Sequence, residues 1–371
     1  MRPSPLRVAI DCRTVAAPKT GDRTYALNLT RALARIDRET LYLLYTAEPT
    51  PYTRLEVPNV EPVVLPVDPP WIWTPFAFPE DLARAHASVA HVQYITPLRA
   101  PCPVITTIHD VAFRRFPRLF PLKHAVLLNT LIPIAVRRAA RVLTGSEATR
   151  RDLLQFYHLA EERVVVTPYA ADPIYRPMDR DLARARVAQA FGIKRPYVLS
   201  VGVLQPRKNL PRLVRAFACL AREFPHQLVL VGKEGWASAE LRRAVAETRL
   251  EARVTFTGYV ADPDLPALYA AADLFAYPSL YEGFGLPPLE AMACGTPVVT
   301  SNVSSLPEVT GDAARWVDPH SVAEIAAALR DLLEDKAERQ RLSAAGLVRA
   351  RRFSWDETAR RTLAVYREVA G

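Results

Sequence analysis

Two glutamates lie on either side of a short loop in the second half of the chain. Glu282 stands directly before Gly283 and Gly285, and Glu290 follows two consecutive prolines. Glycines let a backbone approach a ligand closely, and prolines suit the first turn of a helix. A helix that begins here would direct its N–H groups and its positive dipole end at the loop, which favours an anion. Because carboxylates would repel that anion, we expect them to bind hydroxyl groups, such as those of a sugar.

A pair of cations, Arg207 and Lys208, lies in a second loop of the same half, shortly after Gly202. The loop stands between a strand expected over Tyr197–Val201 and a helix expected from Leu210. Cations at this place could neutralise the charge that develops on a departing diphosphate. Taken alone, an Arg-Lys pair is more typical of a solvated loop.

In the first half, His109 and Asp110 follow a strand expected over Val104–Ile108. A single histidine is more often structural than catalytic. Open α/β sheets, however, bind their ligands at the carboxyl ends of the strands, and this is where His109 lies.

A possible metal-binding pair, Asp262 and Asp264, has the spacing D-x-D. Asp264 directly precedes a leucine, a proline and a helical pattern, which is typical of an N-cap residue. We therefore interpret Asp264 as a helix cap and not as a metal ligand.

Elements that would position these residues alternate between short β-rich runs and helical patterns along the whole chain. The alternation predicts an α/β fold of two doubly wound, Rossmann-like domains that face each other across a cleft. A proline-containing segment over 172–179 separates residues 1–175 from residues 176–353. We expect a last helix, over 354–371 and capped by Ser354 or Asp356, to pack back on the first domain.

Composition limits the class of protein. The chain has 371 residues, and 50% of them are hydrophobic, which suits two domains. Its four cysteines form no CxxC pair, so neither a zinc site nor a disulfide framework is indicated. With no signal-peptide pattern and no apolar run long enough to span a bilayer, we expect a cytoplasmic protein.

The formal net charge of +9 indicates either an anionic partner or a surface rich in solvated arginine. No nucleic-acid-binding motif accompanies the charge, so we expect no nucleic acid. The basic and partly aromatic stretch Phe113–Lys123 could touch anionic lipid at the inner face of a membrane. An acceptor loop or plain surface are the alternative interpretations of this stretch.

The loop from Glu282 to Glu290 resembles the E-x7-E motif of glycosyltransferase family 4, the group 1 glycosyltransferases, whose members have the GT-B fold. The resemblance spans nearly the whole chain and is strongest over 197–311. It implies a retaining transfer of a hexose from a nucleotide sugar. Glu282 would bind the donor sugar and Glu290 the ribose, while the backbone of four residues would hold sugar and diphosphate: Gly283, Phe284, Gly285 and Leu286.

The resemblance also implies roles outside this loop. Arg207 and Lys208, near Gly202, would bind the diphosphate, and Tyr259 and Val260 would hold the nucleobase. In the first, acceptor-binding domain, the resemblance places His109 near the anomeric carbon of the donor and gives Asp110 an orienting role. The second domain would bind the donor, which is a substrate, and the resemblance implies no bound metal and no cofactor.

One departure concerns the loop after the first strand, which is glycine-rich in the family. Here it holds a single glycine, Gly21, in the stretch 20–25. We expect Gly21 to keep the turn and to lie at the donor site. Arg23 could reach a phosphate or the acceptor, or fill space.

The motifs around His109 and Arg207 are most similar to bacterial mannosyltransferases of cell-surface polysaccharide synthesis. GDP-mannose is therefore the first expected donor and a UDP-hexose the second. The acceptor would be a glycan or a lipid-linked glycan. An epimerase of the same fold and a non-catalytic protein that binds sugar nucleotides are the alternatives.

Overall fold

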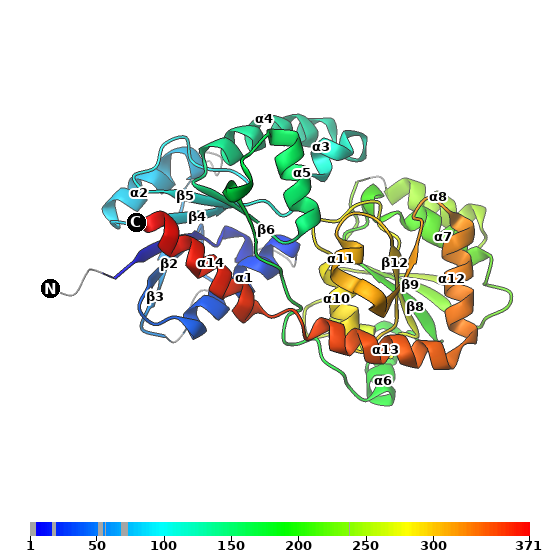
Figure 1. Cartoon of the computed structure of the whole chain (residues 1–371). Helices are drawn as coiled ribbons and strands as arrows, with labels where there is room; N and C mark the ends of the chain where they lie inside the picture. Colours follow the sequence, from blue (N-terminus) through cyan, green and yellow to red (C-terminus); the bar gives the residue numbers. More distant parts are fainter. Residues whose placement is uncertain (1–4, 17–19, 51–54, 56, 68–72, 237) are drawn as a thin grey trace. The chain divides into compact units, whose positions relative to one another are not determined.

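The computed structural model describes residues 5–16, 20–50, 55, 57–67, 73–236 and 238–371. The chain divides into two compact units. Unit 1 comprises Met1–Tyr169 and Ser354–Gly371, and unit 2 comprises Ala170–Phe353 (Figure 1). The boundary that the sequence suggested after residue 175 thus lies inside unit 2.

Unit 1 contains a seven-stranded sheet in the order β3-β2-β1-β4-β5-β6-β7, and all its pairings are parallel. Because β1 lies between β2 and β4, the strand order reverses there, as in doubly wound sheets. The strands are β1 (Arg7–Asp11), β2 (Leu41–Thr46), β3 (Val60–Val64), β4 (Val89–Gln93), β5 (Val104–Thr107), β6 (Arg141–Thr144) and β7 (Val164–Val166).

Helices cover this sheet, and side chains at their first turns fix where several begin. The helices are α1 (Gly21–Ile36), α2 (Phe78–Arg84), α3 (Ala112–Arg115), α4 (Leu122–Arg138), α5 (Glu147–Tyr157) and α14 (Trp355–Ala370). Thr20, Ser146 and Ser354 accept backbone N–H groups at the starts of α1, α5 and α14. Helix α14 packs against α1, so the last segment of the chain completes unit 1.

Unit 2 contains a six-stranded parallel sheet in the order β10-β9-β8-β11-β12-β13. Its strands are β8 (Tyr197–Val201), β9 (Gln227–Val231), β10 (Val254–Gly258), β11 (Leu274–Tyr277), β12 (Val298–Ser301) and β13 (Ala314–Val317). The reversal falls between β8 and β11, so the carboxyl ends of these two strands lie side by side.

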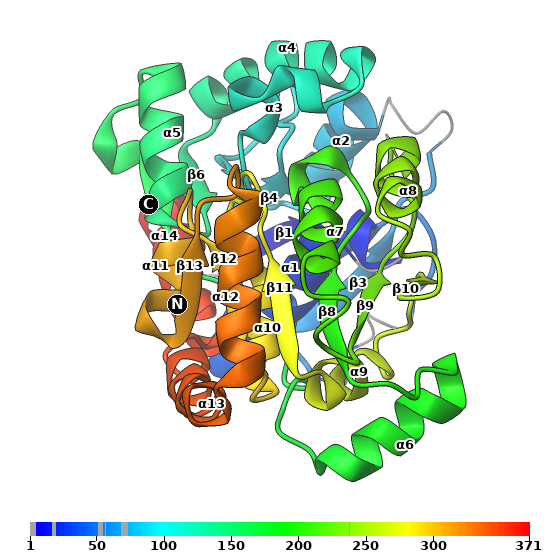
Figure 2. The same ribbon diagram turned by 90° about the vertical axis from the view of Figure 1, so that its right-hand side faces the viewer.

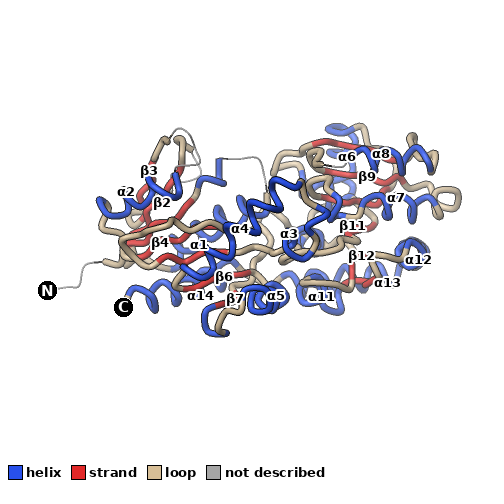
Figure 3. Tube along the Cα trace, turned by 90° about the horizontal axis from the view of Figure 1, so that it is seen from above, coloured by secondary structure: helices blue, strands red, loops and turns tan. Residues whose placement is uncertain are grey.

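The helices of unit 2 cover its sheet, and α7 lies between α8 and α12 (Figure 2). The helices are α6 (Arg180–Phe191), α7 (Leu210–Ala218), α8 (Ser238–Glu247), α9 (Leu265–Ala271), α10 (Leu286–Ala293), α11 (Leu306–Thr310), α12 (Val322–Glu334) and α13 (Lys336–Ala350). In both units the strands run among helices (Figure 3), which confirms the expected α/β class. None of the helices described is both long and apolar enough to cross a membrane.

Candidate functional site

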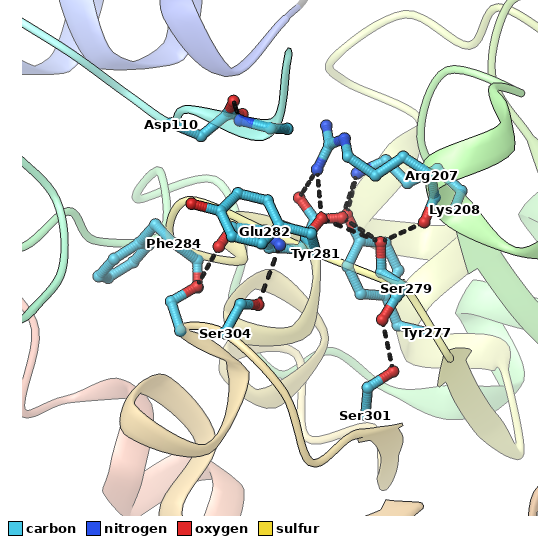
Figure 4. Close-up of polar contacts among 12 residues, drawn as sticks. Asp110, Arg207, Lys208, Tyr277, Ser279, Tyr281, Glu282, Phe284, Ser301 and Ser304 are labelled. Atoms are coloured by element: carbon cyan, nitrogen blue, oxygen red, sulfur yellow. Dashed lines mark hydrogen bonds and ion pairs between the residues drawn. The ribbon is translucent and has the colours of Figure 1, made fainter. Parts of the chain in front are cut away.

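The loop between β11 and α10 carries Glu282, and serines from the next strand–helix connection hold it in place (Figure 4). The backbone N–H of Glu282 donates to Ser304 Oγ over 3.0 Å. Ser305 Oγ donates to the carbonyl oxygens of Glu282 and Phe284, at 2.9 and 2.8 Å. Because these bonds engage the backbone on both sides of Gly283, the position of the Glu282 carboxylate is fixed before any ligand arrives.

Both predicted cations bind this carboxylate. Arg207 Nη1 lies 2.5 Å from Glu282 Oε2, and Lys208 Nζ lies 2.7 Å from Glu282 Oε1. Arg207 also donates to the carbonyl oxygen of Tyr281 at 2.7 Å, and Lys208 donates to the hydroxyl of Tyr277. The three charged side chains are nearly buried, so they form one compact group with a formal charge of +1 (Figure 4).

Electrostatics within the group favour the ionised carboxylate. Burial alone would raise the pKa of Glu282, but Arg207 and Lys208 outweigh burial and lower that pKa to about 2. The ion pairs therefore stabilise the folded state fully above the ordinary pKa of a glutamate, near 4.5, and lose this contribution as the pH falls toward 2. A net positive, water-poor group of this kind attracts a phosphate.

The cations are positioned by a 3₁₀ turn over Pro206–Lys208 that follows β8. Asn209 ends this turn with φ 59°, and its side-chain amide donates to the carbonyl oxygens of Pro278 and Pro319 at 2.9 and 2.7 Å. Gly202 has φ 147°, and a Cβ on it would lie 3.3 Å from Cε of Lys208. Gly202 therefore gives Lys208 room to reach Glu282.

The start of α10 depends on Gly285. This residue has φ 105°, and a Cβ on it would lie 2.9 Å from Cδ2 of Leu306, so only glycine fits without strain. The prolines at 287 and 288 have no N–H, so Gly285 and Leu286 carry the donors that remain at this helix end. Phe284 is buried, with its ring edge-on to the ring of Phe353.

Glu290, the second glutamate of the motif, is buried in α10. Its Oε2 accepts a hydrogen bond from the hydroxyl of Tyr269 in α9 at 2.8 Å. Burial first, and then the charge of Glu290, raise the pKa of this tyrosine, so Tyr269 is a hydrogen-bond donor at every ordinary pH. Tyr269 carries a polar tip within an otherwise apolar helix, which is a sequence signal for a buried hydrogen bond of this kind.

Tyr259 and Val260, the expected contacts of the nucleobase, follow strand β10. Tyr259 is half-exposed and Val260 is buried. Asp264 does stand at the start of α9, but its side chain caps no backbone N–H. Its carboxylate instead pairs with Arg186 at 2.7 Å, so our interpretation of the side chain as a cap is wrong. Within the described residues, no group of three or more His, Cys, Asp or Glu is arranged to hold a metal ion.

His109 in unit 1 follows β5, and both of its ring nitrogens have partners. Nδ1 lies 2.7 Å from the hydroxyl of Tyr169, and Nε2 lies 2.7 Å from Oε1 of Gln93. Gln93 donates its amide N–H to Thr14, so its oxygen faces the histidine. Because the oxygen of Gln93 can only accept, the proton lies on Nε2, and in the neutral ring Nδ1 accepts the hydroxyl of Tyr169. Burial lowers the pKa of His109 despite the opposing effect of Asp22 and Asp110, in agreement with a neutral ring.

The carboxylate of Asp110 binds the backbone at the start of α3 rather than the ring of His109. Its Oδ1 accepts the backbone N–H of Ala112 at 2.9 Å, which caps the start of α3. Gln93 and Tyr169 hold the ring instead. Gln93 ends β4, the strand beside β5, and the sequence shows no signal for this pairing.

One expectation for the first loop, a turn at Gly21, is wrong, and of the alternatives for Arg23 the structure agrees with the filling of space. Gly21 is the first residue of α1, and Thr20 caps the helix with a bond to the N–H of Arg23. Gly21 therefore forms no left-handed turn, and open space surrounds it. Arg23 is buried and donates to the carbonyl oxygen of Val15 at 3.2 Å, so it fills the interior.

Comparisons with known proteins show what the chain is similar to. The profile described as "Glycosyl transferases group 1" matches residues 183–349, and the profile described as "Glycosyltransferase Family 4" matches residues 20–174. The chain is 38% identical over 267 residues to the O-antigen chain mannosyltransferase B of Escherichia coli. The alignment covers 71% of this chain and 70% of that protein.

Solved structures share the fold. Sucrose-phosphate synthase from Thermosynechococcus elongatus has a TM-score of 0.79 at 24% identity, over 98% of each chain. Alr3699/HepE from Anabaena, solved in complex with UDP-glucose, has a TM-score of 0.75 at 21% identity, over 98% of this chain and 100% of that one. With both family profiles, the mannosyltransferase relative and these structures in agreement, the chain belongs to the group 1 glycosyltransferases of family 4 and has their GT-B fold.

Proposed function

We propose that this glycosyltransferase moves mannose from GDP-mannose to a hydroxyl group of a glycan or a lipid-linked acceptor, with retention of the anomeric configuration. The observation that carries the proposal is the contact of Arg207 and Lys208 with one buried carboxylate, Glu282. This group has a net positive charge beside the glycine loop at the start of α10. A nucleoside diphosphate is the leaving group that such a site suits.

In the proposed reaction the acceptor hydroxyl attacks the anomeric carbon on the face from which the nucleotide leaves. As the bond to the diphosphate lengthens, negative charge develops on its oxygens. Arg207 and Lys208 stabilise that charge, because they are held in place beforehand and need no reorganisation. Side-chain cations thus supply the charge neutralisation in this scheme, so we propose that no metal ion is required.

Glu282 has a second role in this proposal. Family resemblance gives it a contact with the donor sugar, but both of its oxygens already accept hydrogen bonds, from Arg207, Lys208 and Ser279. We therefore assign Glu282 the positioning of the two cations as well. Glu290 remains proposed as the ribose contact, and Tyr269 fixes the direction of its carboxylate.

The mannose donor rests on the similarity to a bacterial mannosyltransferase. A UDP-hexose is the alternative donor. Binding without transfer, or conversion of the donor into an epimer, are the alternative activities. Transfer gives a glycosylated acceptor, an epimerase gives the epimer of the donor, and binding alone gives no product, so one set of incubations separates them.

The test combines donor binding with product analysis. Thermal unfolding is followed with GDP-mannose, UDP-glucose, UDP-galactose, UDP-GlcNAc, GDP and UDP, each with a metal chelator. We expect stabilisation by GDP-mannose and GDP, and transfer of mannose to a glycan acceptor with the α-anomer of the donor retained in the product. Stabilisation by the uridine compounds alone would assign the donor to the UDP-hexoses.

Matched variants test whether the donor stabilises the protein by binding at the proposed site. Arg207→Ala and Glu290→Ala should abolish stabilisation by the donor. Arg222→Ala and Glu240→Ala, which change exposed side chains of the same unit, should keep it. If no sugar nucleotide stabilises the protein, or if the control variants lose binding equally, the proposed site is wrong.

A further inference from the structure

The segment from Val111 to Ser146 in unit 1 contains no aspartate or glutamate. It contains seven lysines and arginines: Arg114, Arg115, Arg118, Lys123, Arg137, Arg138 and Arg141. Arg115 pairs with Asp152, and Arg141 pairs with Glu368. The other five are exposed, and none forms an ion pair with a carboxylate in the described part of the structure. The segment therefore presents uncompensated positive charge.

Apolar side chains are exposed on the same segment, along helix α4. Leu122 is 79% exposed, Val126 57%, Leu127 51% and Ile134 40%. The opposite side of the helix packs into the core through Ala125, Ile132, Ala135 and Val136. A helix that is apolar on all sides is usually buried on all sides, but α4 runs along the upper edge of unit 1 (Figure 1). Its exposed apolar side chains need an explanation.

The cations and the apolar residues share one face. Lys123, Leu127, Ile134 and Arg137 follow helical spacing, and Leu122 and Val126 lie beside them at a spacing of four. We call these six residues the α4 outer face. Arg118 and Arg138 lie next to it in sequence and are also exposed. Any partner of this face must accept aliphatic side chains and positive charge together.

This requirement distinguishes between partners. A second copy of the chain would bring a second set of cations against the first, and like charges at contact repel. A nucleic acid would satisfy the cations, but its bases stack on aromatic rings, and the exposed apolar residues here are aliphatic. A bilayer with anionic headgroups satisfies both, since it offers negative phosphates above an acyl layer.

We propose that the α4 outer face docks on the surface of a bilayer rich in anionic lipid. In this arrangement α4 lies in the plane of the interface, its leucines and valine reach the acyl boundary, and its cations contact lipid phosphates. In the stretch Phe113–Lys123, Phe113 is buried in the core of unit 1, and Phe116 and Phe120 are only partly exposed, so we do not assign the apolar contact to these rings. The apolar contact comes from α4 instead.

Co-sedimentation with vesicles tests the proposal without donor or acceptor, so the result does not depend on the proposed sugar transfer. The full chain is mixed with vesicles of phosphatidylcholine alone, or of phosphatidylcholine with phosphatidylglycerol. We expect binding to the anionic vesicles and not to the neutral ones, and weaker binding as salt is added.

Two sets of variants distinguish the contribution of the α4 outer face to vesicle binding from that of the overall charge of the protein. The charge variant combines Arg118→Gln, Lys123→Gln, Arg137→Gln and Arg138→Gln. Its control combines Arg222→Gln, Arg243→Gln, Arg351→Gln and Arg352→Gln, which remove the same charge from exposed positions of unit 2. We expect the vesicle partition constant to fall about fivefold for each cation removed from the α4 region, and to stay near the wild-type value in the control.

The apolar variant combines Leu122→Ser, Val126→Ser and Leu127→Ser, and its control combines Ile174→Ser, Leu182→Ser and Val348→Ser, which are exposed in unit 2. We expect only the former to lose vesicle binding, with an unchanged unfolding midpoint in both. Absence of binding to anionic vesicles, equal loss in variant and control, or self-association of the wild type that Leu122→Ser removes would each overturn the proposal.

Discussion

His91 Nδ1 and the hydroxyl of Tyr366 lie 2.5 Å apart, although 275 residues separate them in the sequence. The bond joins β4 in the centre of the sheet of unit 1 to α14. The other ring nitrogen of His91 lies 2.7 Å from the hydroxyl of Thr107. A histidine enclosed in this way has no room for water around an added charge. Burial, with a smaller contribution from His109, lowers the pKa of His91 to about 3.

This buried histidine predicts acid sensitivity. An unfolded histidine takes up a proton as the pH falls below about 6.5, whereas folded His91 does so only near pH 3. Stability is therefore lost progressively between these values, at up to about 1.4 kcal/mol per pH unit from this residue. The free energy of unfolding, measured with denaturant between pH 7 and pH 4, should therefore depend less steeply on pH for His91→Asn than for the wild type. Equal slopes would contradict the prediction, whatever the absolute stabilities.

Replacing the shared carboxylate tests the role of Glu282. We expect Glu282→Gln to lower the free energy of unfolding by about 3–5 kcal/mol, because Arg207 and Lys208 remain buried without a counter-charge. The exposed pair of Glu223 and Arg330 provides the control, and Glu223→Gln should change stability very little. Denaturant titration of both variants measures the difference.

Glu282→Gln also distinguishes the two proposed roles of this carboxylate, which are to position Arg207 and Lys208 and to contact the donor sugar. With Glu282 neutral, the formal charge of the group rises from +1 to +2. Bare nucleoside diphosphate should then bind at least as tightly as to the wild type, while sugar transfer is lost. Weaker binding of the bare diphosphate by a folded variant would show that positioning of the cations outweighs the gain in charge.

Gly285 offers a test of the loop backbone. We expect Gly285→Ala to destabilise the protein by about 1–3 kcal/mol, because alanine is strained at φ 105° and its Cβ would collide with Leu306. Gly21→Ala is the matched control, since open space surrounds Gly21 and its φ is not positive. That change should be neutral or stabilise slightly. Similar unfolding midpoints for the two variants would disprove the strain at Gly285.

Gln93 is expected to act through His109, as a positioning residue. Gln93→Glu places a carboxylate against Nε2, which should raise the pKa of His109 and give the rate of transfer a pH dependence near neutrality. Gln93→Met removes the hydrogen bond without adding charge, so it should lower kcat without shifting the pH profile. The measurement is kcat as a function of pH for the wild type and the two variants. Identical pH profiles for wild type and Gln93→Glu would show that Gln93 does not position His109 for the reaction.

Much of the fold could be predicted because it depends on local sequence patterns. Alternating strands and helices give parallel sheets, and the confirmed α/β class follows from that alternation. The start of α10 is another local case, since two prolines after Gly285 admit few conformations other than a first helical turn. Ser146 and Ser354 each stand directly before a helical pattern, so their roles as N-caps can also be predicted from the sequence.

The contacts that tune individual side chains could not be predicted in the same way. Gln93 meets His109 only because β4 is the neighbour of β5, and strand order is not visible in a sequence. Tyr269 reaches Glu290 from a different helix, and Glu282 meets Arg207 across 75 residues. The expected cap at Asp264 does not form because Arg186, 78 residues away in sequence, binds the carboxylate, and the local pattern at the helix start contains no sign of this partner.

The division of unit 1 into two separate stretches of chain has a consequence for synthesis on the ribosome. Helix α14 follows the whole of unit 2 in sequence, and it covers α1 and supplies Tyr366 to His91. Unit 2 is a single continuous stretch, so it can fold as soon as it emerges. Until unit 2 has been made, α14 is absent, so the side of α1 that α14 covers remains exposed on the nascent chain during that interval.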